Sequence, residues 1–250
     1  IFEVKNWVVH HKEHADRQLI KGIDLNVRKG EIVGIAGLMG SGRTELAMSI
    51  FGRSYGQKIS GKVLLHGKEI DVSTIDKAMA AGIAYVTEDR KNYGLVLIDD
   101  IKRNITLANL PGVSRNGKID DNQEQKVAHK FRRDLNIRCS SVSQQTVNLS
   151  GGNQQKVVLS KWLFTGPEIL ILDEPTRGID VGAKYEIYTI IARLAEEGKG
   201  IVVISSEMPE VVGISDRIYV MNEGRMVGEM PTREASQEKI MRAIMKSWDK

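Results

Sequence analysis

The stretch GLMGSGRT at residues 37–44 has the spacing of a loop that binds phosphate. Such loops follow the pattern G-x-x-x-x-G-K-[ST], in which backbone amides surround the phosphates and the final hydroxyl ligates Mg²⁺. Gly37, Gly42 and Thr44 fall in register, whereas Arg43 takes the place of the lysine. The pattern predicts a nucleotide-binding loop made of Gly37, Leu38, Met39, Gly40, Ser41, Gly42, Arg43 and Thr44.

Two carboxylates follow an unbroken apolar run in the segment ILILDEP, residues 169–175. Phosphoryl transfer needs a metal that neutralises charge and a group that aims the nucleophile. We expect Asp173 to hold Mg²⁺, directly or through water, together with the hydroxyl of Thr44. Glu174 is expected to orient or deprotonate the attacking water. These two acids, combined with the glycine loop, predict nucleotide hydrolysis.

A second anion-binding segment is predicted at NLSGGNQQK, residues 148–156. Ser150 offers a hydroxyl, and Gly151 and Gly152 offer unobstructed backbone amides, which together can form an anion-binding concavity. Asn153 and Gln154 continue the segment as the polar start of a helix. Because one domain does not need two such concavities for one nucleotide, this segment is expected to contact a nucleotide held by a different domain.

Strands and helices that alternate along the chain must position these residues. Short apolar runs predict strands, and runs with helical periodicity between them predict helices, a pattern typical of an α/β fold with a mainly parallel sheet. Two hairpins are predicted to turn at His66–Gly67 and at Asn222–Gly224. The predicted strands are 1–9, 23–27, 31–37, 83–86, 168–172 and 200–205, and the predicted helices are 44–52, 73–82 (with Ser73 as cap and Gly82 as stop), 157–166, 183–198 and 236–245.

The stretch 88–155 differs from the rest of the chain because it is polar and mostly helical in pattern, with a loop at 111–117. It predicts an inserted helical lobe. We therefore expect one nucleotide-binding domain over 1–250. Its α/β lobe would cover approximately 1–87 and 156–250, and its helical subdomain approximately 88–155.

The composition is that of an ordinary globular protein, with 41% hydrophobic and 27% charged residues in 250. The net charge of +4, with acidic and basic residues mixed along the chain, gives no argument for nucleic acid. Cys139 has no second cysteine to pair with. No run approaches the ~20 apolar residues that span a bilayer, and no signal peptide is recognisable. Because Ile1 leads straight into a strand-like segment, we expect the sequence to be part of a longer chain.

The three motifs in this order, GLMGSGRT, LSGGNQQK and ILILDEPTRGID, resemble the ATP-binding domain of an ABC transporter, and the resemblance covers nearly the whole chain. The segments TEDRKNYGL and ISSEMPE are similar to the C-terminal half of the two-domain ATPases that power import of ribose, galactose, xylose and multiple sugars in bacteria. The resemblance implies a P-loop NTPase fold with a mainly parallel core sheet, N-terminal antiparallel strands and an inserted helical subdomain. It also implies ATP and Mg²⁺ as cofactors.

The resemblance further implies partners and roles. The partners are a second ABC half, transmembrane permease subunits and, indirectly, a periplasmic sugar-binding protein, with no nucleic acid; the location is peripheral, on the cytoplasmic face of the inner membrane. Glu88 matches the loop glutamine that senses the permease and the metal. Asp180 matches the loop that touches the opposite half, and Ser206 stands where most ABC domains have the switch histidine. ABC halves pair head to tail, so Ser150 to Gln154 would serve the partner's nucleotide.

Two departures from the pattern concern the chain's own site. Arg43 keeps the charge of lysine but brings a planar fork that must find room, and Ser206 lacks the histidine ring. We expect a site that binds ATP and hydrolyses it slowly, since Glu174 is retained. An alternative is a non-catalytic nucleotide-binding module that regulates or scaffolds. A DNA-repair or chromosome ATPase is rejected because about a hundred residues, without sustained heptads, separate Gly42 from Ser150.

The residue that stacks on adenine stays open at this point. Trp7 is the nearest candidate, but a tryptophan in an amphipathic strand is more often part of the core, and it is left out of the predicted site. His10 and His11 are alternatives.

Overall fold

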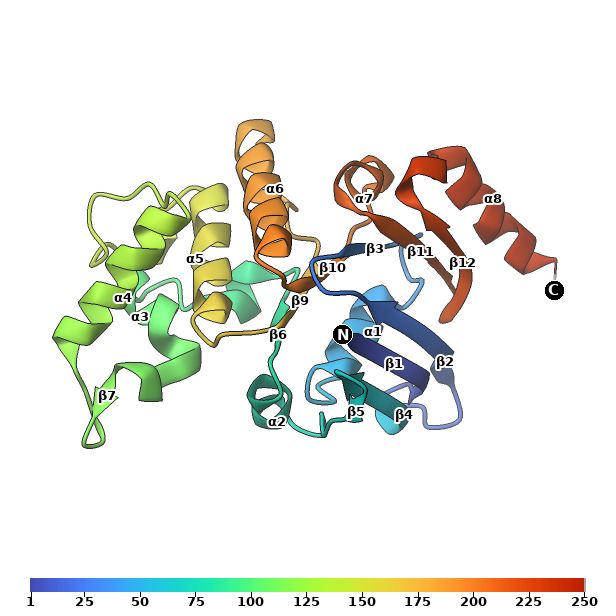
Figure 1. Ribbon diagram of the computed structural model, residues 1–250, viewed down its shortest axis with the longest axis horizontal. Helices are drawn as coiled ribbons and strands as arrows, with labels where there is room; N and C mark the ends of the chain where they lie inside the picture. The colour runs from blue at the N-terminus through green and yellow to red at the C-terminus, as the bar shows by residue number, and fades with distance from the viewer. Residues whose placement is uncertain (250) are drawn as a thin grey trace. The chain divides into compact units, whose positions relative to one another are not determined.

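The structure is a computed structural model that describes residues 1–249 (Figure 1). The chain divides into two compact units. The first contains Ile1–Tyr85, Glu168–Glu174 and the chain from Ile191 onward, and the second contains Val86–Pro167 and Pro175–Ile190. The insert predicted at 88–155 lies inside the second unit, which is longer because Gly151–Leu163 and residues 175–190 pack with it. That the insert acts as a separate subdomain stays a prediction.

A six-stranded sheet forms the centre of the first unit. Its order is β12-β11-β3-β10-β9-β6, and β11, β3, β10 and β9 run parallel to their neighbours in that series, with β12 antiparallel at one edge. The predicted mainly parallel core sheet is confirmed. The strands are β3 (Ile32–Gly37), β6 (Ile83–Val86), β9 (Ile169–Asp173), β10 (Gly200–Ile204), β11 (Arg217–Asn222) and β12 (Arg225–Pro231).

The continuous apolar runs of the central strands follow from their position, because a parallel sheet is usually covered on both faces. Every residue of β3, β9 and β10 is buried. The helices of the first unit are α1 (Arg43–Ile50), α2 (Ile75–Ala80), α7 (Met208–Ile214) and α8 (Gln237–Trp248), with a short helical turn at Thr232–Glu234. α8 lies beside the hairpin β11–β12 (Figure 1) and buries Ile240 and Ile244 in a cluster with Val211 and Val220.

An antiparallel sheet of order β2-β1-β4-β5 completes the first unit, and the predicted N-terminal antiparallel strands are confirmed. Its strands are β1 (Phe2–His10), β2 (Gln18–Val27), β4 (Gln57–Leu65) and β5 (Lys68–Glu69). Arg217, at the start of β11, ties this sheet to the six-stranded one. Its side chain pairs with both oxygens of Glu31 at 2.9 and 3.0 Å and with Glu229 of β12 at 2.7 Å, and it donates to the backbone oxygen of Asn26 in β2 at 2.8 Å.

The second unit is mainly helical. α3 (Ile101–Thr106) packs against both α4 (Asp121–Asp134) and α5 (Gly151–Leu163), and α6 (Val181–Glu196) begins in this unit. Asp100, Asp120 and Ser150 cap the first three of these helices through side-chain oxygens that accept amide protons three residues on. Shorter elements are the helical turns Arg90–Gly94, Leu107–Val113 and Thr146–Asn148 and the strands β7 (Ser114–Arg115) and β8 (Lys118–Ile119).

Both predicted hairpin turns are confirmed. His66 and Gly67 lie in the left-handed region at φ +50° and +76°, as do Glu223 and Gly224 at +46° and +76°. Gly224 is also required by space, since a Cβ there would lie 1.7 Å from the backbone oxygen of Leu19.

Three local predictions were wrong or incomplete. The cap of α2 is Thr74 rather than Ser73, because the Oγ1 of Thr74 accepts the amide of Lys77 at 3.2 Å. The loop predicted at 111–117 contributes β7 to a two-stranded ribbon, and helix α7 was missed because its seven residues are too few for a clear period. Within residues 1–249, no helix combines the length and the apolar character needed to cross a bilayer.

Candidate functional site

The loop between β3 and α1 leaves room and donors for an anion. A Cβ on Gly37 would lie 2.5 Å from the backbone oxygen of Met221 and 2.8 Å from the Oγ of Ser41, so only glycine fits there. Gly40 and Gly42 have φ of +78° and +97°. No side chain caps α1 at Gly42, and the buried Oγ of Ser41 has no hydrogen-bond partner among residues 1–249. These open donors suit a phosphate at a helix N-terminus.

Arg43 is built into this loop rather than extended from it. Its side chain is 7% exposed, and its guanidinium donates to the backbone oxygen of Ser205 at 2.6 Å and, more weakly, to that of Leu38 at 3.4 Å. The planar fork therefore finds room by bridging the phosphate loop and the end of β10. Leu38 packs against the core cluster that contains Val220, and Met39 is 87% exposed.

Glu174, just after β9, is held at the same edge of the sheet. Its backbone N–H donates to the oxygen of Ile204 at 2.8 Å, and its carboxylate accepts the N–H and the hydroxyl of Ser206 at 2.7 and 3.2 Å. Burial raises the pKa of Glu174, and the hydrogen bonds from Ser206 and the charge of Arg43 only partly oppose this. Glu174 also has φ +47°, a strained value for a residue with a side chain.

Asp173 and Thr44 are the predicted metal ligands. Asp173 is fully buried, and one of its oxygens accepts the hydroxyl of Tyr85 at 2.9 Å. Among residues 1–249, no group of three or more His, Cys, Asp or Glu side chains is arranged to hold a metal. The oxygen donors of Asp173 and Thr44 are nevertheless enough for Mg²⁺, because this ion usually takes one or two protein ligands and completes its shell with phosphate and water.

Parallel strands explain why these residues meet. The strands β3, β10 and β9 lie side by side and run in one direction. The loop after Gly37, the acids after Leu172 and the residues after Ile204 therefore emerge together at the carboxyl ends of these strands. Ligands of α/β sheets bind at this edge. The structure thus brings Glu174 and Ser206 into hydrogen-bonding contact, and Arg43 is bound to the backbone oxygen of the adjacent Ser205.

The predicted signature residues belong to the second unit. Ser150 caps α5, and its Oγ accepts the side-chain amide of Asn153 at 2.9 Å. The two glycines are close-packed: a Cβ on Gly151 would lie 2.8 Å from Arg90, and one on Gly152 would lie 2.6 Å from the Cβ of Ala183. Both glycines therefore allow α5 to approach Arg90 and Ala183 closely.

Arg90 is a residue that the sequence prediction missed. Its guanidinium donates to the backbone oxygen of Arg177 at 2.9 Å and lies 3.4 Å from the side-chain oxygen of Gln154. Glu88 pairs with Arg177 at 2.7 Å, which joins the same turn. Asp180 follows this turn and accepts the amide of Ala183 at 3.0 Å. Arg90 thus links the segments that contain Glu88, Gln154 and Asp180. The sequence could have suggested Arg90 as a site residue, because it lies two residues after the predicted site residue Glu88.

Trp7 lies in the core and cannot stack on a base. It is 1% exposed, and its indole N–H donates to the Oγ of Ser49 at 2.9 Å. His11 stacks on His14, with ring centres 5.0 Å apart, and His10 lies 3.4 Å from the oxygen of Lys58.

Comparison with known proteins identifies the family. The sequence model of the ABC transporter family matches residues 20–177. The chain is 62% identical over 247 residues to an L-arabinose transport ATP-binding protein of Geobacillus stearothermophilus, covering 99% of this chain and 48% of that protein. It is 51% identical to a xylose import ATP-binding protein of Thermoanaerobacter pseudethanolicus, covering 96% of this chain and 48% of that protein. The chain spans about half the length of the curated relatives it matches.

Solved structures support the fold. A crystallised ATP-binding cassette of an ABC transporter superposes with a TM-score of 0.81 at 21% identity, covering 97% of this chain and 98% of that one. At that identity the likeness concerns the fold alone, and it confirms the predicted P-loop NTPase architecture. Together with the family match over most of the sequence, it leads to one conclusion: the chain belongs to the ABC transporter family.

Proposed function

We propose that this chain is an ATP-binding domain that couples ATP binding and hydrolysis to the import of a monosaccharide through an ABC transporter. The observation that carries the proposal is the hydrogen-bonded pair of Glu174 and Ser206, with Arg43 bound to the adjacent Ser205, beside the open phosphate loop. The arabinose and xylose importers named above support sugar as the transported class. As in the sequence-based prediction, the chain would form the C-terminal half of a two-half ATPase on the cytoplasmic face of the membrane.

In this proposal Glu174 acts as the general base. It accepts a proton from water as the water oxygen attacks the γ-phosphorus of ATP, and the bond from that phosphorus to the bridging oxygen breaks to give ADP and phosphate. Ser206 positions the carboxylate through its two hydrogen bonds. Thr44 and Asp173 would hold Mg²⁺, which neutralises charge on the phosphates when bound. Glu88 would report the state of the permease, and Asp180 that of the second half.

We also propose that the chain's own site is weak. The guanidinium of Arg43 is held against two backbone oxygens, so it is less free to move toward a phosphate than the ammonium group of a lysine would be. Position 206 is a serine, so it has no imidazole that could contact the γ-phosphate. The hydroxyl of Ser206 instead contacts Glu174. The signature segment from Ser150 to Gln154 would complete the competent site of the partner half.

The second candidate is a nucleotide-binding module without hydrolysis. Arg43 and Ser206 favour it, whereas the raised pKa of Glu174 favours a working base, since a general base is most effective with a pKa near the working pH.

Replacing Glu174 by glutamine tests these two candidates. We expect slow Mg-ATP hydrolysis by the unmodified chain, and a loss of about a hundredfold in the variant, because general-base catalysis contributes ~10²–10⁴. ATP affinity should be nearly unchanged.

The carboxylate is the active form, so turnover should fall as pH drops through the pKa of Glu174, which lies above the ordinary 4.5. Glu168→Gln, at the opposite end of β9, is the matched control. Equal turnover in all three proteins would favour the non-catalytic module.

Replacing Arg43 by lysine tests the weak site. A lysine ammonium group is a compact charge on a flexible stem rather than a rigid planar fork, so it should be freer to reach phosphate. We expect Mg-ATP to bind about tenfold more tightly, measured by calorimetry, since a charge-assisted contact contributes ~1.5–3 kcal/mol. Arg43→Gln, which removes the charge, should bind more weakly than either form. Unchanged or weaker binding by the lysine form would mean that the loop is adapted to arginine.

A further inference from the structure

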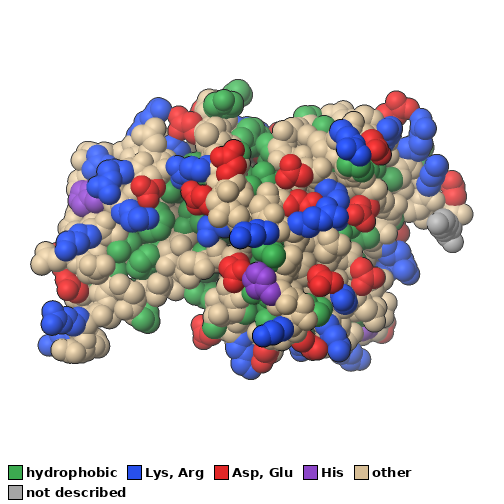
Figure 2. All heavy atoms as spheres, in the orientation of Figure 1, with side chains coloured by type: hydrophobic (Ala, Val, Ile, Leu, Met, Phe, Trp, Pro, Cys, Tyr) green, Lys and Arg blue, Asp and Glu red, His purple; other side chains and the backbone are tan. Residues whose placement is uncertain are grey.

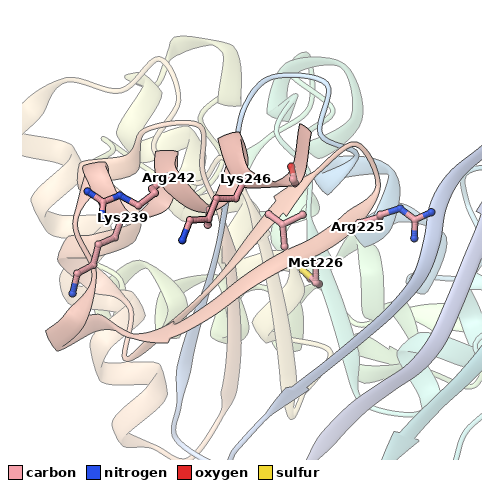
Figure 3. A pocket seen from close by; sticks show the side chains of 8 residues that line it. Arg225, Met226, Lys239, Arg242 and Lys246 are labelled. Atoms are coloured by element: carbon pink, nitrogen blue, oxygen red, sulfur yellow. The ribbon is translucent and has the colours of Figure 1, made fainter. Parts of the chain in front are cut away.

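A groove lies between the edge strand β12 and helix α8, away from the phosphate loop in sequence. It has a volume of about 780 Å³ and is lined by Arg225, Met226, Val227, Lys239, Arg242, Ala243, Lys246 and Ser247. Figure 3 shows Lys239, Arg242 and Lys246 projecting from α8, whereas Arg225, at the start of β12, points away from these three side chains. Positions 239, 242 and 246 are three and four residues apart, so they share one face of the helix.

The lining is unusual in its charge. On the surface displayed in Figure 2, acidic and basic side chains are interspersed, but the eight residues that line the groove include four cations and no carboxylate. Within residues 1–249, neither Arg225 nor Lys246 forms an ion pair. Lys239 donates to the backbone oxygen of Glu234 at 2.6 Å, which leaves its charge uncompensated. Only Arg242 has an acidic partner, Glu238, at 2.6 Å.

The size and the floor of the groove indicate the kind of ligand. Pockets for small organic molecules have volumes of roughly 300–1,000 Å³ and apolar walls with a few polar groups. Met226, Val227 and Ala243 supply such a wall. A bare inorganic ion would leave most of this space to water. Arginine forks and lysine ammonium groups together are the side chains that bind phosphate.

We propose that the groove between β12 and α8 binds a soluble organic phosphate with two or more negative charges, such as a phosphorylated sugar. Its phosphates would lie among Lys239, Arg242 and Lys246, and its carbon skeleton against Met226 and Val227. The site is separate from the nucleotide loop and is carried by the last strand and helix described in the chain.

A competing explanation is that the cations only protect β12, since charged side chains on an edge strand prevent pairing with other chains. Protection requires no ligand and no saturable binding. An anionic membrane surface would also attract these cations. In that case the chain would bind anionic vesicles but would not bind a soluble phosphate.

The test uses the 250-residue chain and fructose 1,6-bisphosphate as the probe, because this molecule is not a nucleotide. Calorimetry at low ionic strength should show saturable binding of one equivalent, and the emission of Trp248, which is 55% exposed at the end of α8, should change along the same curve. Lys246→Ala and Lys239→Ala should each weaken binding about tenfold, as expected for the loss of one charge-assisted contact.

Lys68→Ala is the matched control, because Lys68 is an exposed cation of β5 in the same unit, and it should bind like the unmodified chain. Circular dichroism of the variants would confirm that they are folded. The proposal is overturned if the probe does not bind, if Lys68→Ala weakens binding as much as Lys246→Ala does, or if only vesicles of phosphatidylglycerol bind.

Discussion

Replacing Ser150 by arginine is expected to remove most of the ATPase activity and sugar uptake of the assembled transporter, whereas Arg43→Ala should leave a substantial fraction of both. Ser150 caps α5 and, in the proposed function, contacts the γ-phosphate of the partner's competent site. Transition-state charge would be stabilised there, and loss of one such donor costs roughly 10²–10³ in turnover. Arg43 would serve only the weak site. The measurement is turnover and uptake by the reconstituted transporter, with both ABC halves and the permease present.

The choice of Ser150 follows from the packing around it. Substituting Gly152 would push a Cβ against Ala183 and disturb the packing of α5, whereas Ser150 is exposed and loses only its cap, which contributes about 1 kcal/mol. Thr74→Arg is the matched control, since Thr74 is the exposed cap of α2 and its loss should leave activity unchanged. If Arg43→Ala abolishes activity while Ser150→Arg spares it, the competent and weak sites are assigned the wrong way round.

Replacing Arg217 by methionine should lower the free energy of unfolding by about 3–5 kcal/mol, the usual effect of removing one partner of a buried ion pair. The side chains of Arg217 and Glu31 are each 9% exposed, and the variant would leave the Glu31 carboxylate buried without its guanidinium. The bonds to Asn26 and Glu229 would also be lost, which would loosen the tie between the two sheets. Urea unfolding of the 250-residue chain measures the change.

The effect should depend on pH in a defined direction. Burial alone would raise the pKa of Glu31, but the hydrogen bonds from Arg217 and from the amide of Arg28 outweigh it, so the net pKa lies below the ordinary 4.5. The stability that this carboxylate adds is therefore present above pH 4.5 and is lost as pH falls through its folded pKa. The gap between the two proteins should narrow in acid.

Arg233→Met makes the same change on an exposed arginine and should leave unfolding almost unaffected. Combining Arg217→Met with Glu31→Gln should restore part of the lost stability, because no buried charge remains. An equal loss in the double variant and in Arg217→Met would show that packing, rather than charge, explains the effect.

The sequence was sufficient for much of the fold because its signals are local. The apolar runs at 169–173 and 200–204 became buried parallel strands, and His66–Gly67 and Glu223–Gly224 became turns because each pair contains a glycine, which adopts a left-handed backbone without strain. The glycine loop followed by a helix is likewise a local pattern, and the structure places it at the edge of the sheet where a phosphate loop is expected.

What the sequence could not supply depends on contacts between distant residues. Nothing in the local sequence of Arg217 indicates that it pairs with Glu31, 186 positions away. Ser73 and Thr74 are equally good caps by type, and the backbone of Thr74 decided between them. The sequence did not indicate where the fork of Arg43 would find room, because its acceptor, the oxygen of Ser205, follows a distant strand. Arg90 needed the packed signature helix before its partners were visible.

The backbone conformation of Glu174 creates a conflict between the proposed activity of the chain and the stability of its fold. A left-handed φ at a residue with a side chain costs roughly 1–3 kcal/mol, and glycine adopts that conformation without the penalty. Selection for heat resistance alone would therefore favour glycine at position 174 and discard the carboxylate that the proposed reaction needs. Substitutions that stabilise the fold should therefore be sought at other positions, where they can offset this strain without removing the carboxylate.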